Sequence, residues 1–232
     1  MKVGLLLCDH VRPGFQVVAG DYSEFFERLL PSQELVVFDL PAGEFPQDLD
    51  SCDGWITSGS RHSVYEDVDW IARFAGLVRT LHDQGRQLVG VCFGAQMIAH
   101  ALGGTVGPAA TGWAVGVKDV EVVSKEPWMN PAVDSFRILH SNADQISSLP
   151  PGARLLGRAR EVPVSALAVD DHIIGFQGHP EFSAAYSAVL MEGRRDTPIP
   201  TAVVEAGLQS LREPPDTDLL ASWIQRFLSN PL

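Results

Sequence analysis

Strand-like and helix-like patterns alternate along the first half of the chain. Apolar runs that are typical of buried strands occupy residues 3–8, 34–40, 54–57 and 88–91. Apolar side chains recur at helical spacing in residues 21–30 and 66–84, and Pro31 and Gly85 stand where these two helices should end. This alternation predicts a mostly parallel sheet with helices on both faces.

The pattern changes after Gly103-Gly104. Alternating apolar and polar positions, which are typical of half-buried antiparallel strands, occupy residues 115–123, 136–140, 155–159 and 164–169. A buried strand returns at residues 173–178, and a Pro-containing connection joins two expected helices at about 184–194 and 218–228. We therefore predict one three-layer α/β domain over residues 1–232. Its central sheet should be mostly parallel and partly mixed, with the C-terminal helices of about 184–232 packed on it.

Composition and charge narrow the class of protein. The chain has 232 residues, of which 45% are hydrophobic and 20% are charged, so it can bury a core without disulfides or a structural metal. Its net charge of −12 would repel nucleic acids and anionic membranes, and Arg194-Arg195 is too short to form a basic patch. No apolar run reaches the roughly 18 to 20 residues that a membrane helix needs. Neither a nucleic-acid partner nor a membrane partner is therefore expected.

The cysteines indicate the compartment. Three cysteines at unrelated spacings favour a reduced, cytoplasmic protein over a disulfide framework. Cys8 and Cys52 lie in or beside strand-like runs and are expected in the core. The chain contains neither a CxxC pair nor an HExxH motif, so we expect no metal site and no cofactor.

The stretch around Cys92 carries the strongest chemical signal. An apolar strand runs into Gly90-Val91-Cys92-Phe93-Gly94, and a helical pattern follows. This order is typical of a strand that ends in a sharp turn, presents one side chain at its tip and continues as a helix. The two glycines leave room in the tight turn, and the helix N-terminus would stabilise a thiolate. Cys92 is thus either a nucleophile or, as most lone cysteines are, a small core residue.

A nucleophilic cysteine needs a base and a group that orients the base. His179 is the best candidate among the seven histidines, because it ends a buried strand and Glu181 follows two residues later, within reach of the imidazole. The same segment would also fit a capped strand end. His62 is a candidate for substrate contact, and His140 and Asp144 are expected to share a structural hydrogen bond.

Three motifs together resemble the signatures of class I, triad-type glutamine amidotransferase domains. They are Thr57-Ser58-Gly59-Ser60, Gly90-Val91-Cys92-Phe93-Gly94-Ala95-Gln96 and Gly178-His179-Pro180-Glu181-Phe182. The resemblance covers most of the chain, from the first strand to past Glu181. Residues 139–146 are similar to a segment of the GMP synthase glutaminase domain. Residues 63–67 resemble stand-alone bacterial and plant members of that branch, some of which are γ-glutamyl peptidases.

The resemblance implies a flavodoxin-like fold and a covalent mechanism. Cys92 would attack the γ-carboxamide of glutamine, His179 would relay the proton to departing ammonia, and Glu181 would hold the imidazole. Water would then hydrolyse the γ-glutamyl thioester to glutamate.

The resemblance also implies what surrounds the triad. The backbone N–H groups of Gly59 and Phe93 would form the oxyanion hole, and Gln96 and Ser60 would contact the substrate. Gly178 departs from the phenylalanine that is common in the family. We expect this glycine to widen the pocket for a γ-glutamyl group attached to something larger than ammonia.

Three functions remain open on the sequence. The first is hydrolysis of glutamine, with ammonia passed to a separate synthase; such a partner is expected because the chain shows no synthase domain of its own. The second is a self-sufficient γ-glutamyl peptidase or hydrolase that acts on a conjugate. The third is a binding or regulatory protein that keeps the fold without turnover, which an intact set of Cys92, His179 and Glu181 disfavours.

Overall fold

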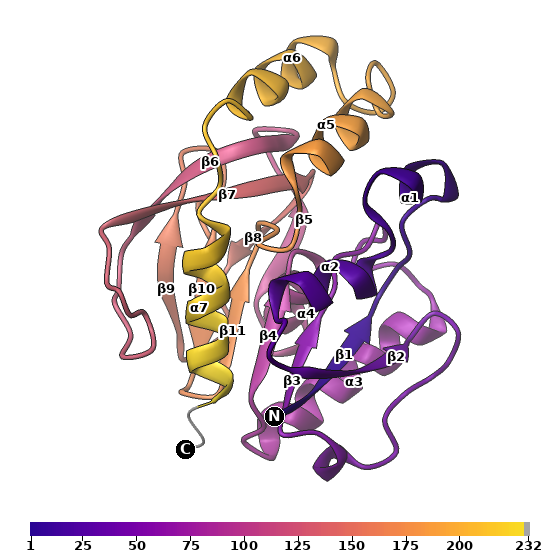
Figure 1. Ribbon diagram of the computed structural model, residues 1–232. Helices are drawn as coiled ribbons and strands as arrows, with labels where there is room; N and C mark the ends of the chain where they lie inside the picture. The colour runs from indigo at the N-terminus through magenta and orange to yellow at the C-terminus, as the bar shows by residue number, and fades with distance from the viewer. Residues whose placement is uncertain (230–232) are drawn as a thin grey trace.

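The computed structural model describes residues 1–229, and within them the main sheet has nine strands in the order β2-β1-β3-β4-β11-β10-β9-β6-β7 (Figure 1). Five neighbouring strands run parallel: β2 (Glu34–Asp39), β1 (Lys2–Leu7), β3 (Gly54–Thr57), β4 (Leu88–Val91) and β11 (Ile173–Phe176). The other four pair in antiparallel fashion: β10 (Ala166–Val169), β9 (Ala153–Arg158), β6 (Ala114–Val122) and β7 (Ser135–Asn142). The predicted α/β class, with a mostly parallel and partly mixed sheet, is confirmed.

Helices cover both faces of the parallel strands. α2 (Tyr22–Leu29) and α7 (Thr217–Leu228) pack on one face. α3 (Asp69–Asp83) and α4 (Phe93–Ala101) pack on the other face. The apolar stripe that predicted α3 is buried, with Phe74 and Val78 fully covered. Gly85 follows this helix with φ 64°, a conformation that its missing Cβ allows. No helix within residues 1–229 has the length and apolar character needed to cross a bilayer.

The sequence pattern missed several small elements. α1 (Pro13–Ala19) has no buried residue and its Val17 is 88% exposed, so no apolar stripe marks it. α6 (Thr201–Ser210) lies in the connection for which only a Pro-containing loop was expected, and it packs on β6 through Val204. The other missed elements are the 3₁₀ helix η1 (Leu49–Ser51) and a separate antiparallel pair, β5 (Thr105–Pro108) and β8 (Asp144–Ser148). The helix expected at about 184–194 is present as α5 (Ala184–Glu192).

The carboxyl ends of four parallel strands meet at one edge of the sheet. β1 leads to Asp9, β3 to Gly59, β4 to Cys92 and β11 to His179. In open α/β sheets, ligands bind in the crevice outside this edge. The topology therefore brings together residues that are far apart in the sequence at the place where a site is expected.

Candidate active site

Cys92 stands at a strained turn between β4 and α4. Its backbone has φ 49° and ψ −103°, and residues with a side chain rarely adopt a positive φ. A Cβ on Gly90 would lie 2.7 Å from the Ala95 nitrogen, and one on Gly94 would overlap the Thr57 side chain. The turn therefore needs Gly90 because of neighbouring backbone, as the sequence predicted, whereas Gly94 is needed because β3 brings Thr57 close to it.

His179 lies at the end of β11, beside Cys92. Its backbone N–H donates to the Leu139 carbonyl at 2.7 Å, and its Nδ1 lies 2.8 Å from Glu181 Oε1. The His179 and Glu181 side chains are buried, with exposed fractions of 4% and 0%. The Phe182 ring stacks on the imidazole with 3.8 Å between ring centres and 11° between the planes. The imidazole is thus held at one nitrogen by a carboxylate and on its face by an aromatic ring, a contact that the sequence did not indicate.

The charges around His179 favour its protonated form. Burial opposes protonation, but the charges of Glu181 and Cys92 and the hydrogen bonds to both outweigh it and raise the pKa of His179 from 6.5 to about 10. Because Nδ1 is engaged with the carboxylate, Nε2 is the nitrogen left for the sulfur. At neutral pH an imidazolium therefore stands beside the Cys92 sulfur.

Gly59 and Phe93 place two backbone N–H groups next to Cys92. Phe93 is the first residue of α4, and neither its amide nor that of Gly59 donates a hydrogen bond to a described residue. A Cβ on Gly59 would lie 2.8 Å from His179 Cε1 and 3.5 Å from Cys92 Cβ, so this glycine packs directly against both residues. Free amides at this place can stabilise a negative oxygen that forms next to the sulfur.

Ser60 and Gln96 line the space around the sulfur, but protein groups also engage their side chains. The Ser60 hydroxyl accepts the backbone N–H of His62 at 3.2 Å. The Gln96 side-chain amide donates to the Asp144 carbonyl at 2.7 Å and to Gln177 Oε1 at 3.2 Å, so it ties α4 to the segments at β8 and β11. Contacts of Ser60, Gln96 and His62 with a substrate stay predictions.

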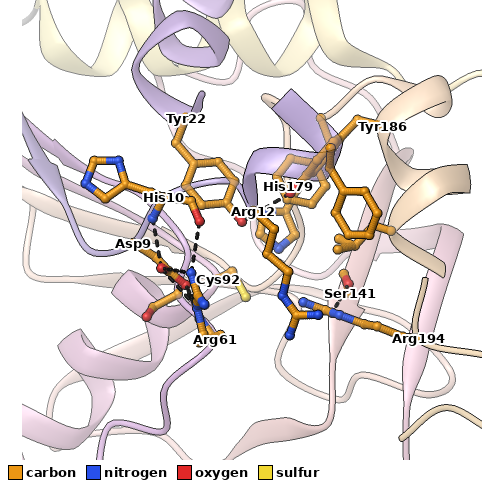
Figure 2. Close-up of a pocket in the computed structure, with 14 residues that line it drawn as sticks. Asp9, His10, Arg12, Tyr22, Arg61, Cys92, Ser141, His179, Tyr186 and Arg194 are labelled. Atoms are coloured by element: carbon orange, nitrogen blue, oxygen red, sulfur yellow. Dashed lines mark hydrogen bonds and ion pairs between the residues drawn. The ribbon is translucent and has the colours of Figure 1, made fainter. Parts of the chain in front are cut away.

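Two cavities meet at Cys92. The wider one has a volume of about 330 Å³ and reaches Asn142 and Asp144. The narrower one, of about 30 Å³, lies on the side of His179 and Tyr186 (Figure 2). A carbonyl group at the sulfur can therefore extend into a different cavity on each side. Both cavities share the lining residues Arg12, Ser60, Arg61, Ser141 and Arg194.

Three of these shared residues are arginines that the sequence pattern did not single out as site residues. Arg61 forms a bidentate ion pair with Asp9, in which Nε donates to Oδ2 at 2.8 Å and Nη2 donates to Oδ1 at 2.6 Å. Arg194 donates to Ser141 Oγ at 3.0 Å. The only available signal was the position of Arg12 and Arg61 shortly after β1 and β3, at the edge where ligands bind. Arg194 follows a helix and carried no such signal.

Gly178 does not widen the pocket, contrary to the expectation from sequence. A Cβ at this position would lie 2.8 Å from the Ile138 side chain and 2.8 Å from the Leu139 carbonyl oxygen. The residue therefore faces β7, and its missing side chain allows the close approach of that strand. Its effect on the substrate cavities is correspondingly small.

The predicted hydrogen bond between His140 and Asp144 is also absent. His140 Nδ1 lies 3.2 Å from Asn142 Oδ1, and Asp144 accepts from the Ser63 hydroxyl instead. His140 lies on β7 and Asp144 begins β8, and these two strands belong to different sheets, so the two side chains have different neighbours. Burial lowers the pKa of His140 to about 3, so the ring is neutral.

Within residues 1–229 one group of side chains could hold a metal ion, and it lies away from Cys92. His82, Asp170 and His172 bring ligand atoms within 4.8 Å of one another. Asp170 follows β10 and His172 precedes β11, so the group is at the opposite edge of the sheet from Cys92. A cation there would take no part in chemistry at the sulfur.

The sequence has relatives of known family. It matches the family model for class-I glutamine amidotransferases over residues 32–189, which include Cys92, His179 and Glu181. It is 31% identical over 173 residues to γ-glutamyl peptidase 4 of Arabidopsis thaliana, a match that covers 71% of this chain and 69% of the relative. It is 36% identical over 133 residues to a glutamine-hydrolysing GMP synthase of Thermomicrobium roseum, which covers 55% of this chain and 23% of that enzyme.

The fold has counterparts among solved structures. A glutamine amidotransferase from Thermotoga maritima superposes with a TM-score of 0.75 and covers 98% of this chain and 99% of its own. The sequence identity of this pair is 21%, so the match shows the fold alone. Because the family model spans more than half of the chain, the chain belongs to the class-I glutamine amidotransferase family.

Proposed function

We propose that the chain hydrolyses γ-glutamyl amides through a covalent thioester, with Cys92 as nucleophile, His179 as general base and acid, and Glu181 as the group that orients His179. The supporting observation is the buried contact of 2.8 Å between His179 and Glu181 beside a cysteine held at positive φ on the tip of β4. A cysteine that only fills the core needs neither the strained backbone nor the adjacent ion pair.

In the first half of the reaction the Cys92 sulfur attacks the γ-carbonyl carbon. A C–S bond forms, and the π electrons of the carbonyl move onto its oxygen. The N–H groups of Gly59 and Phe93 stabilise this oxygen, at roughly 3 to 4 kcal/mol per donor. The oxyanion then collapses, the C–N bond breaks, and the leaving nitrogen takes a proton from His179. Glutamine releases ammonia in this step, and a γ-glutamyl peptide releases an amine.

In the second half water attacks the carbonyl carbon of the thioester. His179, which is now neutral, takes a proton from the water as the C–O bond forms. Collapse of the second oxyanion breaks the C–S bond and returns the Cys92 thiolate. The product is the γ-carboxylic acid of glutamate, which ionises in water. The proton stays on His179, so the site ends in its starting state.

Two substrate classes fit this chemistry. The plant relative named as a γ-glutamyl peptidase supports a self-sufficient hydrolase of γ-glutamyl conjugates. The relative named as a glutamine-hydrolysing GMP synthase supports an ammonia donor that acts with a separate synthase. The match to the peptidase covers 71% of this chain and the match to the synthase covers 55%, so we favour the hydrolase of conjugates.

Glutamate release from glutamine, γ-glutamyl dipeptides and γ-glutamyl amines tests the proposal. Cys92→Ala should abolish release from every substrate, whereas Cys52→Ala, which removes another buried thiol outside the site, should retain it. A glutamine-mimicking diazo ketone should add to Cys92, as peptide mass spectrometry detects. Activity in Cys92→Ala would exclude this nucleophile. A wild-type protein that neither releases glutamate nor reacts with the diazo ketone would be a binding protein.

A further inference from the structure

Arg12 and Arg194 lie beside Cys92 without a carboxylate partner among residues 1–229. Arg12 precedes α1, Arg194 follows α5, and both line the two cavities that meet at the sulfur. Figure 2 shows the two guanidinium groups next to each other, with Ser141 close to Arg194. The guanidinium carbon of Arg194 also lies 5.8 Å from the centre of the Trp113 ring. The ring and the hydroxyl hold this arginine in place without neutralising it.

The third arginine at the sulfur provides the contrast. Arg61 is neutralised by Asp9, which accepts two hydrogen bonds from its guanidinium. Arg194 is half-buried, and this burial, together with the charge of Arg12, lowers its pKa. Two neighbouring cations without a carboxylate partner repel each other, and a bound carboxylate relieves this repulsion. In a chain of net charge −12 such a pair is a local feature and not part of a generally positive surface.

Arg12 and Arg194 lie on the side of Cys92 where the leaving group of the substrate has to be. His179 shares the narrower cavity with both arginines, and it has to reach the nitrogen that leaves. The group attached to this nitrogen therefore extends along the cavity past Arg12 and Arg194. Ammonia offers no negative group for them to bind. In a γ-glutamyl amino acid, a carboxylate is attached one carbon atom beyond the leaving nitrogen.

We propose that Arg12 and Arg194 together bind a carboxylate of the leaving group. The preferred substrates are then γ-glutamyl amino acids or peptides whose leaving amine carries a carboxylate, and not glutamine. This inference rests on the proposed hydrolase function. Guanidinium groups match a carboxylate with parallel N–H···O bonds, and such charge-assisted bonds are stronger than neutral ones. Their loss should change kcat/KM by roughly tenfold or more.

Two substrates that differ only in the carboxylate isolate this contact: γ-glutamylglycine and γ-glutamylglycinamide. In the wild-type protein kcat/KM should be roughly tenfold or more higher for γ-glutamylglycine. In Arg12→Gln and Arg194→Gln the ratio of the two values should fall towards one. Arg12 is exposed, so its variant keeps the fold even if that of Arg194 does not. Arg226→Gln removes an exposed arginine of α7 with the same charge change and should keep the wild-type ratio.

Two results would overturn the inference. One is a ratio near one in the wild-type protein. The other is that Arg12→Gln keeps the wild-type ratio. If kcat/KM falls equally for both substrates in that variant, the arginine binds the α-carboxylate that both glutamyl groups share. Failure of the proposed function gives a different result, because the wild-type protein would then release no glutamate from either substrate or from glutamine.

Discussion

Replacement of Glu181 by glutamine should uncouple His179 from the charge that keeps it protonated. In the wild-type protein Glu181 Oε1 lies 2.8 Å from His179 Nδ1. The substitution keeps the shape of the side chain and an oxygen that can accept a hydrogen bond from Nδ1, but it removes the negative charge. Burial opposes protonation of His179, and the charge of Glu181, followed by that of Cys92, raises its pKa to about 10. We therefore expect the pKa of His179 to fall in Glu181→Gln.

The size of the effect follows from this pKa. The difference between 6.5 and about 10 corresponds to about 5 kcal/mol of preference for the protonated ring. Because the folded-state pKa is the higher one, this contribution to stability is fully present below pH 6.5 and is lost as the pH rises through about 10. The free energy of unfolding should decline over this window in the wild-type protein. Glu181→Gln should make this decline smaller, because the charge of Glu181 is the first of the favourable contributions to the pKa of His179.

Urea unfolding at several pH values within this window, together with kinetics, measures both consequences. Activity on a γ-glutamyl substrate should fall by about 10²- to 10⁴-fold, because the base loses the group that orients it. Glu192→Gln, which removes an exposed carboxylate, is the control and should resemble the wild-type protein. The reasoning is refuted if Glu181→Gln loses stability with rising pH as steeply as the wild-type protein does, or keeps full activity.

Two further variants examine the turn and the oxyanion loop. Cys92→Gly should be about 1 kcal/mol more stable than Cys92→Ala in urea unfolding. Glycine relieves the positive-φ strain, about 1–3 kcal/mol, and this exceeds its entropic cost of about 0.5–1 kcal/mol. The opposite order of stability would argue against strain at the turn. Gly59→Ala should lower kcat by about 10²-fold, since its methyl group would lie 2.8 Å from His179 Cε1 and displace the imidazole. Wild-type kinetics in this variant would contradict the close packing of the loop against the base.

Long, regular patterns in the sequence predicted most of the sheet and its larger helices. Residues 88–91 and 173–176 are strands covered on both faces, so they had to be apolar without interruption. The helix of residues 69–83 has one buried face and shows it as a stripe. α1 has no fully buried residue, and α6 buries only Val204 and Gly207, so neither produced a periodic pattern. Their positions depend on the elements around them.

The sequence by itself determined the turn at Cys92 and the pairing of His179 with Glu181. Both depend on near neighbours: a Cβ on Gly90 would meet the backbone of Gly94 and Ala95, and a residue two positions on can reach the imidazole. Gly94 is needed for a tertiary reason, because its Cβ would overlap Thr57 of β3. Only the tertiary structure decided that Gly178 packs against β7 and that Arg12 and Arg194 meet beside the sulfur. These contacts join segments that are distant in the chain, and the order of strands in the sheet, which local patterns do not encode, sets which segments meet.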